Sequence, residues 1–490
     1  MQIFRYLRPV LVVPVVLAGL AIIPSSASPD APARGASADP APVQFLDLTT
    51  RSGRTTEIAR AGLDEAEPSP ARTRAQAGED GGDSPAPGGL NALTVVAGDV
   101  GPEADAPDSG ADAFDPERDA VILTDPLKVD DFLVAGFTWT GGEGDAPPDD
   151  VRIYLRVRQS GEWSPWYLNE PSDAGRDDGA ARAGTDELIT GGADAVQASV
   201  VGDAADLPAG LTLALVPDRP SGERSLGAAD VRAVGAGPTG VAGEAADEPA
   251  PTPGRAGSTA ETAAGTTGGA SAARLPSVAL AAETDDPAAL VTTREEWGAN
   301  PAYLNWAPDY APAEHVIVHH TAGTNDYTPE QSPSIVRGIY YYHAVVLGWG
   351  DIGYNFLVDK YGQVFEGRYG TLDSDPGAMV VGGHAYGANT GTMGISMMGN
   401  YSSVSPSEIQ IERVGQMAGW FLGRAGVADA HGSSRYTFHA TQKYRRGQTI
   451  DLDVISAHRD VGYTTCPGNA GYSAMGQIRD IAQAQLDGGR

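Results

Sequence analysis

The stretch Val316–Gly323, with the sequence VIVHHTAG, joins an apolar β-prone run to two adjacent histidines. Its first four residues are expected to form a buried strand that ends at His319. Strand and helix patterns then alternate to the end of the chain, which predicts an α/β domain with a central mixed β-sheet flanked by helices. The other expected elements are a helix from Thr328 to about Val346, strands at Tyr354–Val358, Gln363–Glu366, Met393–Met398 and Val454–Ala457, and helices from a capping box at Ser405–Glu408 to Gly426 and over Ala474–Leu486.

Side chains that bind soft metals follow two of these strands. His458 stands at the end of the strand Val454–Ala457, and Cys466 lies eight residues further on in a loop. With a histidine of the first strand they make two imidazoles and one thiolate, a set that holds zinc with one open position. Zinc in such a site suits amide hydrolysis. His319 and His320 point to opposite faces of a strand, so only one can bind the metal, and spacing alone does not choose.

Cys466 is the single cysteine of the chain, and all eight histidines follow residue 286. An intrachain disulfide is therefore excluded. Three interpretations of this thiol stay open from the residue types: a buried inert side chain, a thiolate nucleophile activated by His458, and a metal ligand.

Six motifs occur in an order that resembles one known family. They are Arg294–Ala299, Val316–Gly323, Asp351–Val358, Val364–Arg368, the pair Gly383–Ala385 and Gly394–Tyr401, and Ala457–Asp460 with Cys466–Gly468. Residues 290–488 thereby resemble the peptidoglycan recognition protein and type-2 N-acetylmuramoyl-L-alanine amidase family. The three lysines and thirty arginines of the chain are typical of a GC-rich genome, such as that of an actinobacterium.

The resemblance assigns the zinc ligands. The first histidine of the strand motif, the histidine of the His-Arg pair and the cysteine before Pro-Gly correspond to His319, His458 and Cys466. Family members that do not cut usually lack this cysteine, so the resemblance favours catalysis over recognition alone. The implied reaction is zinc-dependent hydrolysis of the amide between N-acetylmuramic acid and L-alanine in peptidoglycan; the alternative is a non-catalytic peptidoglycan-binding protein.

The resemblance also implies roles around the metal. Tyr354 matches the catalytic tyrosine, and Thr464 stands where the family has a residue that supports the tetrahedral intermediate. His384, Asn355 and His320 are implied to bind substrate, with His320 packing beside the ligand. A general base is not assigned: Glu366, Asp453 and Asp460 are candidates for which ion-pair or turn roles are favoured.

The rest of the chain divides by composition. Cationic residues Arg5 and Arg8, an apolar run and small residues near Ala27 indicate a secretory signal peptide rather than a retained anchor. The expected organisation is a signal peptide over 1–27, a disordered acidic Pro/Ala-rich part over 28–115 with one short strand at Val43–Leu48, a β-rich sandwich-like domain over 116–220, a linker over 221–285 and the amidase domain over 286–490.

Net charge limits the partners. A formal charge of −31 disfavours nucleic acid and anionic membranes as partners. We expect a secreted monomer of the cell wall whose partner is peptidoglycan, without a membrane span once the signal is removed. Within the β-rich part, the aromatic cluster Trp163–Tyr167 suits either sugar stacking or core packing, and core packing is favoured.

Overall fold

The strand that ends in the paired histidines lies inside a six-stranded sheet. All six residues of β14 (His315–His320) are buried, and the strand runs parallel to β18 (Thr392–Met397) on one side and β21 (Ile455–Ala457) on the other. The sheet order is β12-β16-β15-β18-β14-β21, completed by β12 (Val291–Thr292), β16 (Val364–Glu366) and β15 (Phe356–Val358). Only β15 and β16 pair in antiparallel fashion, so the expected mixed sheet is confirmed.

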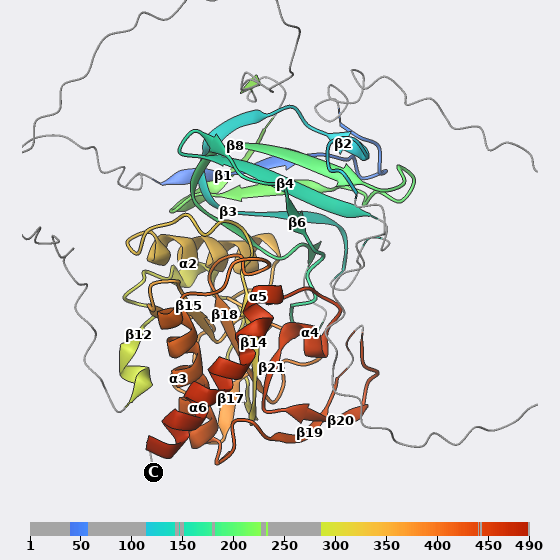
Figure 1. The fold of residues 1–490 in the computed structure, drawn as a ribbon. Coiled ribbons are helices and arrows are strands. Elements are labelled where there is room, and N and C mark those ends of the chain that lie inside the picture. The colour runs from blue at the N-terminus through green and yellow to red at the C-terminus, as the bar shows by residue number, and fades with distance from the viewer. Residues whose placement is uncertain are drawn as a thin grey trace, which may run out of the picture. The chain divides into compact units, whose positions relative to one another are not determined.

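Helices cover both faces of this sheet (Figure 1). α3 (Glu408–Arg424) and α6 (Met475–Gly488) share one core with β14 and β18, while α2 (Ser332–Tyr341) belongs to a second core on the other side. α2 continues as a π-helical turn over Tyr342–Val346. It begins four residues later than predicted, because the Gln331 side chain accepts from the backbone N–H of Thr328 and Pro333 occupies the first turn. The N-cap of α3 is Ser407, not Ser405.

Several short elements were not expected. They are β13 (Tyr310–Pro312) paired with β17 (Ala378–Val380), the hairpin of β19 (Ser433–Thr437) and β20 (Thr449–Asp453), the 3-10 turns Pro287–Leu290 and Pro301–Tyr303, and the short helices α4 (His458–Val461) and α5 (Asn469–Ser473). The β19–β20 hairpin lies between α3 and β21 in the chain. Its inward side chains, among them Tyr436 and Leu452, form a small separate core.

A second sheet precedes this domain in the chain. Its main order is β10-β1-β9-β3-β8-β4-β5, with β2, β6, β7 and β11 pairing at its sides. The bounds are β1 (Ala41–Asp47), β2 (Ala120–Leu123), β3 (Leu127–Gly142), β4 (Arg152–Gln159), β5 (Glu162–Trp163), β6 (Tyr167–Asn169), β7 (Arg182–Gly184), β8 (Leu188–Val201), β9 (Thr212–Val216), β10 (Pro220–Ser225) and β11 (Arg232–Ala233). Leu46 of β1 and Leu155 of β4, from opposite ends of that order, share one core, so the sheet curls into the expected sandwich-like arrangement.

Two expected boundaries need correction. The short strand expected at Val43–Leu48 is confirmed as β1, but it pairs with β9 and β10, so residues 41–47 belong to this sheet and not to a disordered part. Residues 221–225 of β10 were expected in the linker, but their pairing with β1 assigns them to the sheet as well. In both cases the strand is completed by a partner more than 150 residues away in the sequence, and a local pattern does not reveal such a partner.

The computed structural model describes residues 40–56, 114–142, 147, 151–178, 182–226, 232–233, 286–439, 441 and 443–488. The expected signal peptide, all of residues 57–113 and most of the expected linker lie outside these ranges. The described residues belong to one compact unit. Among the helices in the described ranges, none has the length and apolar character needed to cross a membrane.

The two sheets are joined through α2. A Cβ on Gly338 of α2 would lie 2.7 Å from Cγ2 of Val134, and a Cβ on Gly136 of β3 would lie 2.2 Å from the ring of Tyr342. The hydroxyl of Tyr342 donates towards the carbonyl oxygens of Thr185 and Phe137, at 2.9 and 3.2 Å. The close approach therefore depends on two glycines, and it brings the loop between β6 and β7 to the edge of the six-stranded sheet.

Candidate metal centre

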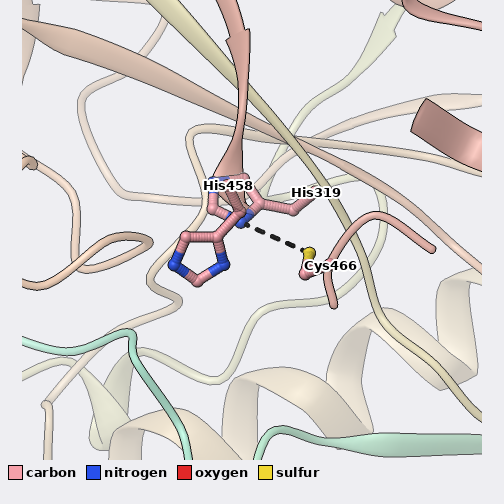
Figure 2. A group of neighbouring side chains, drawn as sticks. All are labelled: His319, His458 and Cys466. Atoms are coloured by element: carbon pink, nitrogen blue, oxygen red, sulfur yellow. Dashed lines mark hydrogen bonds between the residues drawn. The ribbon is translucent and has the colours of Figure 1, made fainter. Parts of the chain in front are cut away.

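Parallel pairing brings two histidines to the same edge of the sheet. Val318 of β14 is in register with Ala457 of β21, so His319 and His458 follow their partners at the same level. Side chains at the carboxyl ends of neighbouring parallel strands meet at one edge of a sheet. α4 and the loop after it then return the chain so that Cys466 lies beside both imidazoles (Figure 2).

The three side chains form a compact set of donors. One donor atom each of His319, His458 and Cys466 lies within 4.8 Å of the others, and Nδ1 of His319 is 3.9 Å from Sγ of Cys466. Zinc with bonds of about 2.0–2.3 Å to tetrahedral ligands holds those ligands about 3.3–3.8 Å apart. All three residues are buried, with at most 3% of each exposed. The geometry and the donor types therefore fit a three-ligand zinc site.

Hydrogen bonds determine which nitrogen of His319 is free. The hydroxyl of Thr392 donates to the carbonyl oxygen of Ala388 and lies 3.2 Å from Nε2 of His384, so that nitrogen is the donor of the pair. Nδ1 of His384 is then an acceptor, 3.0 Å from Nε2 of His319. His319 accordingly carries its proton on Nε2 and presents an unprotonated Nδ1 towards Cys466, as a metal ligand must.

His458 is oriented by the preceding domain. Its Nε2 lies 3.2 Å from the carbonyl oxygen of Asp173, which only accepts, so Nε2 carries the proton and Nδ1 is left for a metal. Burial lowers the pKa of His458 to about 4 and that of His319 well below its ordinary value, so both rings are neutral at pH 7. Burial also raises the pKa of the Cys466 thiol, with Asp186 adding to the effect. The backbone N–H of His320 donates to Sγ of Cys466 at 3.3 Å, which favours the thiolate once a metal replaces the proton.

Tyr354 lies next to this centre. Its ring centroid is 5.4 Å from that of His319, and burial raises the pKa of its phenol well above 10, with Glu187 the next contributor. The phenol is therefore a neutral donor at pH 7. Glu187, from β7–β8 of the first sheet, binds Nε2 of His343 at 3.0 Å, while its Oε1 is buried without a hydrogen-bond partner among the described residues.

Thr464 is also beside the centre, but its hydroxyl is engaged. It donates to Oε2 of Glu170 at 3.0 Å and accepts from the backbone N–H of Cys466 at 3.1 Å. Glu170 accepts from the N–H of Thr465 as well. The predicted support of a tetrahedral intermediate by Thr464 therefore requires that Glu170 release it.

The three residues predicted to bind substrate differ in their surroundings. Asn355 is fully buried and its amide is satisfied by Val380 O, Thr371 and the N–H of Gly394, so it holds the fold together. His384 is fully buried behind His319, and a Cβ on Gly394 would lie 2.3 Å from its ring. Neither side chain is exposed in this structure, so a role for Asn355 and His384 in binding substrate stays a prediction. His320 does line a cavity of about 590 Å³ that also touches Cys466.

The carboxylates proposed as a general base have structural roles. Glu366 accepts from the N–H of Leu372, Asp453 pairs with Arg479, and Asp460 accepts from the N–H of Ala457. Acids from the preceding domain lie around the centre instead, and none of them was predicted as a site residue. Glu170, Asp173, Asp186 and Glu187 lie in a generally acidic stretch, and no local pattern separates them from surface acids.

The aromatic cluster is neither core nor free surface. The guanidinium of Arg156 lies over the rings of Trp163 and Trp166, at 5.4 and 4.6 Å from their centroids. Both rings are half-buried, and Trp166 lines the same cavity as His320. The favoured interpretation as core packing holds only for Tyr167, which packs against the core of the first sheet.

Comparison with known proteins matches two parts of the chain. Residues 309–469 match the family model described as N-acetylmuramoyl-L-alanine amidase, and residues 102–223 match the model described as Rv3811 N-terminal galactose-binding domain-like. The chain is 31% identical over 186 residues to peptidoglycan-recognition protein SC2 of Drosophila simulans, covering 36% of this chain and 80% of that protein. It is 28% identical over 190 residues to peptidoglycan recognition protein 1 of Rattus norvegicus, covering 39% and 87%.

Solved structures give a similar picture. The crystal structure of Drosophila peptidoglycan recognition protein SD aligns with 24% identity and a TM-score of 0.29, covering 38% of this chain and 93% of that one. The ectodomain complex of peptidoglycan recognition proteins LCa and LCx bound to tracheal cytotoxin aligns with 26% identity and a TM-score of 0.29, covering 37% and 92%.

Proposed function

The chain belongs to the peptidoglycan recognition protein and type-2 amidase family, and from that premise we propose that residues 286–490 hydrolyse the amide between N-acetylmuramic acid and L-alanine in peptidoglycan, with zinc as cofactor. The observation that carries the proposal is the convergence of His319, His458 and Cys466, one donor atom each within 4.8 Å. A protein that only binds a glycan has no need for two neutral imidazoles and a thiol buried together.

The residues around the proposed zinc site have different roles in the reaction. Zinc held here supplies a Lewis acid that polarises an amide carbonyl and acidifies a water molecule. His384 holds His319 in the tautomer that leaves Nδ1 free, and in this structure the Asp173 carbonyl does the same for His458. The neutral phenol of Tyr354 donates a hydrogen bond to the oxygen on which negative charge develops, and Thr464 adds a second donor when its hydroxyl is free.

Glu187 is the best candidate to receive a proton. Its Oε1 is buried, without a partner in the described ranges, and it lies beside the Tyr354 phenol. A carboxylate within reach of the reacting water accepts its proton and returns it to the leaving amine. Because Glu187 belongs to the first sheet, the proposed catalytic centre is built from both parts of the unit.

The location and partner follow from the same proposal. A secreted monomer delivered by the proposed signal peptide would meet peptidoglycan in the cell wall. The first sheet would then hold or position the amidase part there.

Digestion of purified cell wall tests the function. The full chain with zinc should release peptides with a new L-alanine N-terminus, and the Cys466→Ala variant and the chelator-treated protein should not. Glu162→Ala, a change to an exposed acid in β5, is the matched control and should cut at the normal rate.

Two other outcomes would replace the proposal. Binding of muropeptide without release of peptide in the presence of zinc would make the chain a recognition protein, as the names of its relatives suggest. Activity that resists chelation but is lost on alkylation of Cys466 would make it a thiol hydrolase.

A further inference from the structure

The segment Glu170–Asp178, between β6 and β7, lies across the edge of the six-stranded sheet where the three proposed ligands meet. We call it the covering segment. Its backbone is bonded to the loop 383–389: Gly175 N donates to Gly383 O at 2.9 Å, and the N–H of Tyr386 donates to Asp173 O at 3.0 Å. The side chain of Asn389 donates to Gly175 O at 2.8 Å. The segment is thus held as a bound extended peptide is held, through its main chain.

Two charged side chains anchor the far end of the covering segment. Oδ1 of Asp177 accepts from the N–H of Gly387 at 2.8 Å and from the amide of Asn389 at 2.7 Å. The guanidinium of Arg176 lies 4.7 Å from the ring centroid of Trp306 and donates to Trp349 O at 3.2 Å. These contacts are specific in position and charge, unlike those of a loop that merely rests on a surface.

The near end of the covering segment closes over the metal centre. Asp173 is 4% exposed, and its Oδ2 is buried without a hydrogen-bond partner in the described part of the chain. A Cβ on Gly462, in the loop between His458 and Cys466, would lie 1.9 Å from that oxygen. Glu170 meanwhile holds the hydroxyl of Thr464. As a result, none of the three proposed ligands is more than 3% exposed.

A substrate attached to a cell-wall polymer needs more room than this. Its scissile amide must reach the metal, Tyr354 and Thr464 together, and the covering segment occupies that approach. The remaining cavity that touches Cys466 is lined by Glu170 and Glu187, so an anionic chain entering there meets like charge. The groove under the segment offers the N–H of Gly387 and the amide of Asn389, which are donors suited to a carboxylate.

We propose that the covering segment is an internal inhibitor: it occupies in cis the groove that accepts an extended acidic peptide, and the hydrolase is latent until it leaves. This inference rests on the proposed function for its consequence, but the closure of the groove is a property that can be measured without activity. Segment and substrate compete for the same donors, so whatever detaches the first sheet's loop exposes the metal, frees Thr464 and admits the peptide.

The test loosens the covering segment in the full chain. The variant Arg176→Ala/Asp177→Ala removes both anchors, and Glu162→Ala is the control. In metal-free protein, alkylation of Cys466 by iodoacetamide is followed by mass spectrometry; the chain has one cysteine, so the signal has a single source. We expect alkylation about tenfold faster in the double variant than in wild type or control, since hydrogen bonds to a charged carboxylate are lost. With zinc, release of peptide from soluble muropeptide should rise by a similar factor.

The outcomes separate this inference from the function. Equal alkylation rates in wild type and double variant would overturn the covering role. Faster alkylation of the double variant, with no peptide release by either protein, would support the covering role and contradict the proposed amidase function. Equal alkylation rates together with equally fast peptide release by both proteins would support the amidase function and contradict the covering role. If circular dichroism shows that the double variant does not fold, Asp177→Asn, which keeps an acceptor for Gly387 but loses the charge, must still speed alkylation for the proposal to stand.

Discussion

Replacement of Asp351 by asparagine should destabilise the protein by about 3 kcal/mol, because it leaves two buried guanidinium groups without their counter-charge. Asp351 is fully buried, and its two carboxylate oxygens each bind one arginine, Arg294 and Arg368, at 2.9 Å. These arginines belong to two of the six motifs, which explains why both motifs carry one. Through Asp351, the two ion pairs connect Arg294, near the start of the domain, with Arg368, in the turn that follows β16.

The magnitude follows from the surroundings of each arginine. Breaking a buried ion pair on one side typically costs about 3–5 kcal/mol. Arg294 is 10% exposed in its side chain and recovers some hydration, whereas Arg368 is fully buried. Arg368 keeps three acceptors, the carbonyl oxygens of Val381, Trp306 and Ala307, and lies 3.9 Å from the centroid of the Trp306 ring. These retained contacts place the cost at the lower end of the range.

The assay is urea unfolding of metal-free protein at pH 7, with the free energy compared at a common slope. Asp130→Asn is the control, because Asp130 and Arg224 form an exposed ion pair with side chains 56% and 42% exposed. Such a pair contributes about 0–1 kcal/mol. A loss for Asp351→Asn below about 1 kcal/mol, equal to that of the control, would refute the argument that the buried charge network holds this domain together.

Three further predictions concern the site. Tyr354→Phe should lower the rate of peptide release by about 10²–10³-fold at unchanged zinc content, since one donor to the developing charge is lost; a change of less than about threefold would exclude Tyr354 from that role. Cys466→Ser should weaken zinc binding by more than about 100-fold in a chelator competition, because loss of an outer-shell partner alone costs about 10–100-fold; an unchanged affinity would exclude the thiolate as a ligand. Burial, with Glu187 beside it, raises the pKa of Asp186 well above its ordinary value, so the native state favours the protonated acid. Its contribution to stability is therefore complete below the ordinary pKa of about 4 and is lost as pH rises above it. The free energy of unfolding in urea, measured on metal-free protein, should fall less between pH 5 and pH 8 for Asp186→Asn than for wild type. An equal fall for both proteins would contradict this.

Much of the six-stranded sheet was predictable because its strands are short, apolar and locally patterned. The strands around His319 and before His458 appear where expected, within one or two residues. The start of α2 was predicted wrongly because two local signals compete. Thr328-Pro329 resembles a helix start, but Pro333 is the proline in the first turn of α2. β8, a strand of 14 residues, is rich in small residues without alternation of apolar and polar side chains, so no local pattern predicts it.

The sequence by itself determined the chemistry that is available. The single cysteine, the clustered histidines and the ordered motifs define the candidate ligands and the family, since residue types and their order are all that such inferences need. The tertiary structure decided what surrounds those ligands. Only the register of parallel β14 and β21 puts His319 beside His458, and only the packing of α2 and its π-helical turn on β3 brings Asp173, Glu170 and Glu187 over the centre. Those contacts join residues from about 140 to nearly 300 positions apart, and a local sequence pattern carries no information on partners at that separation.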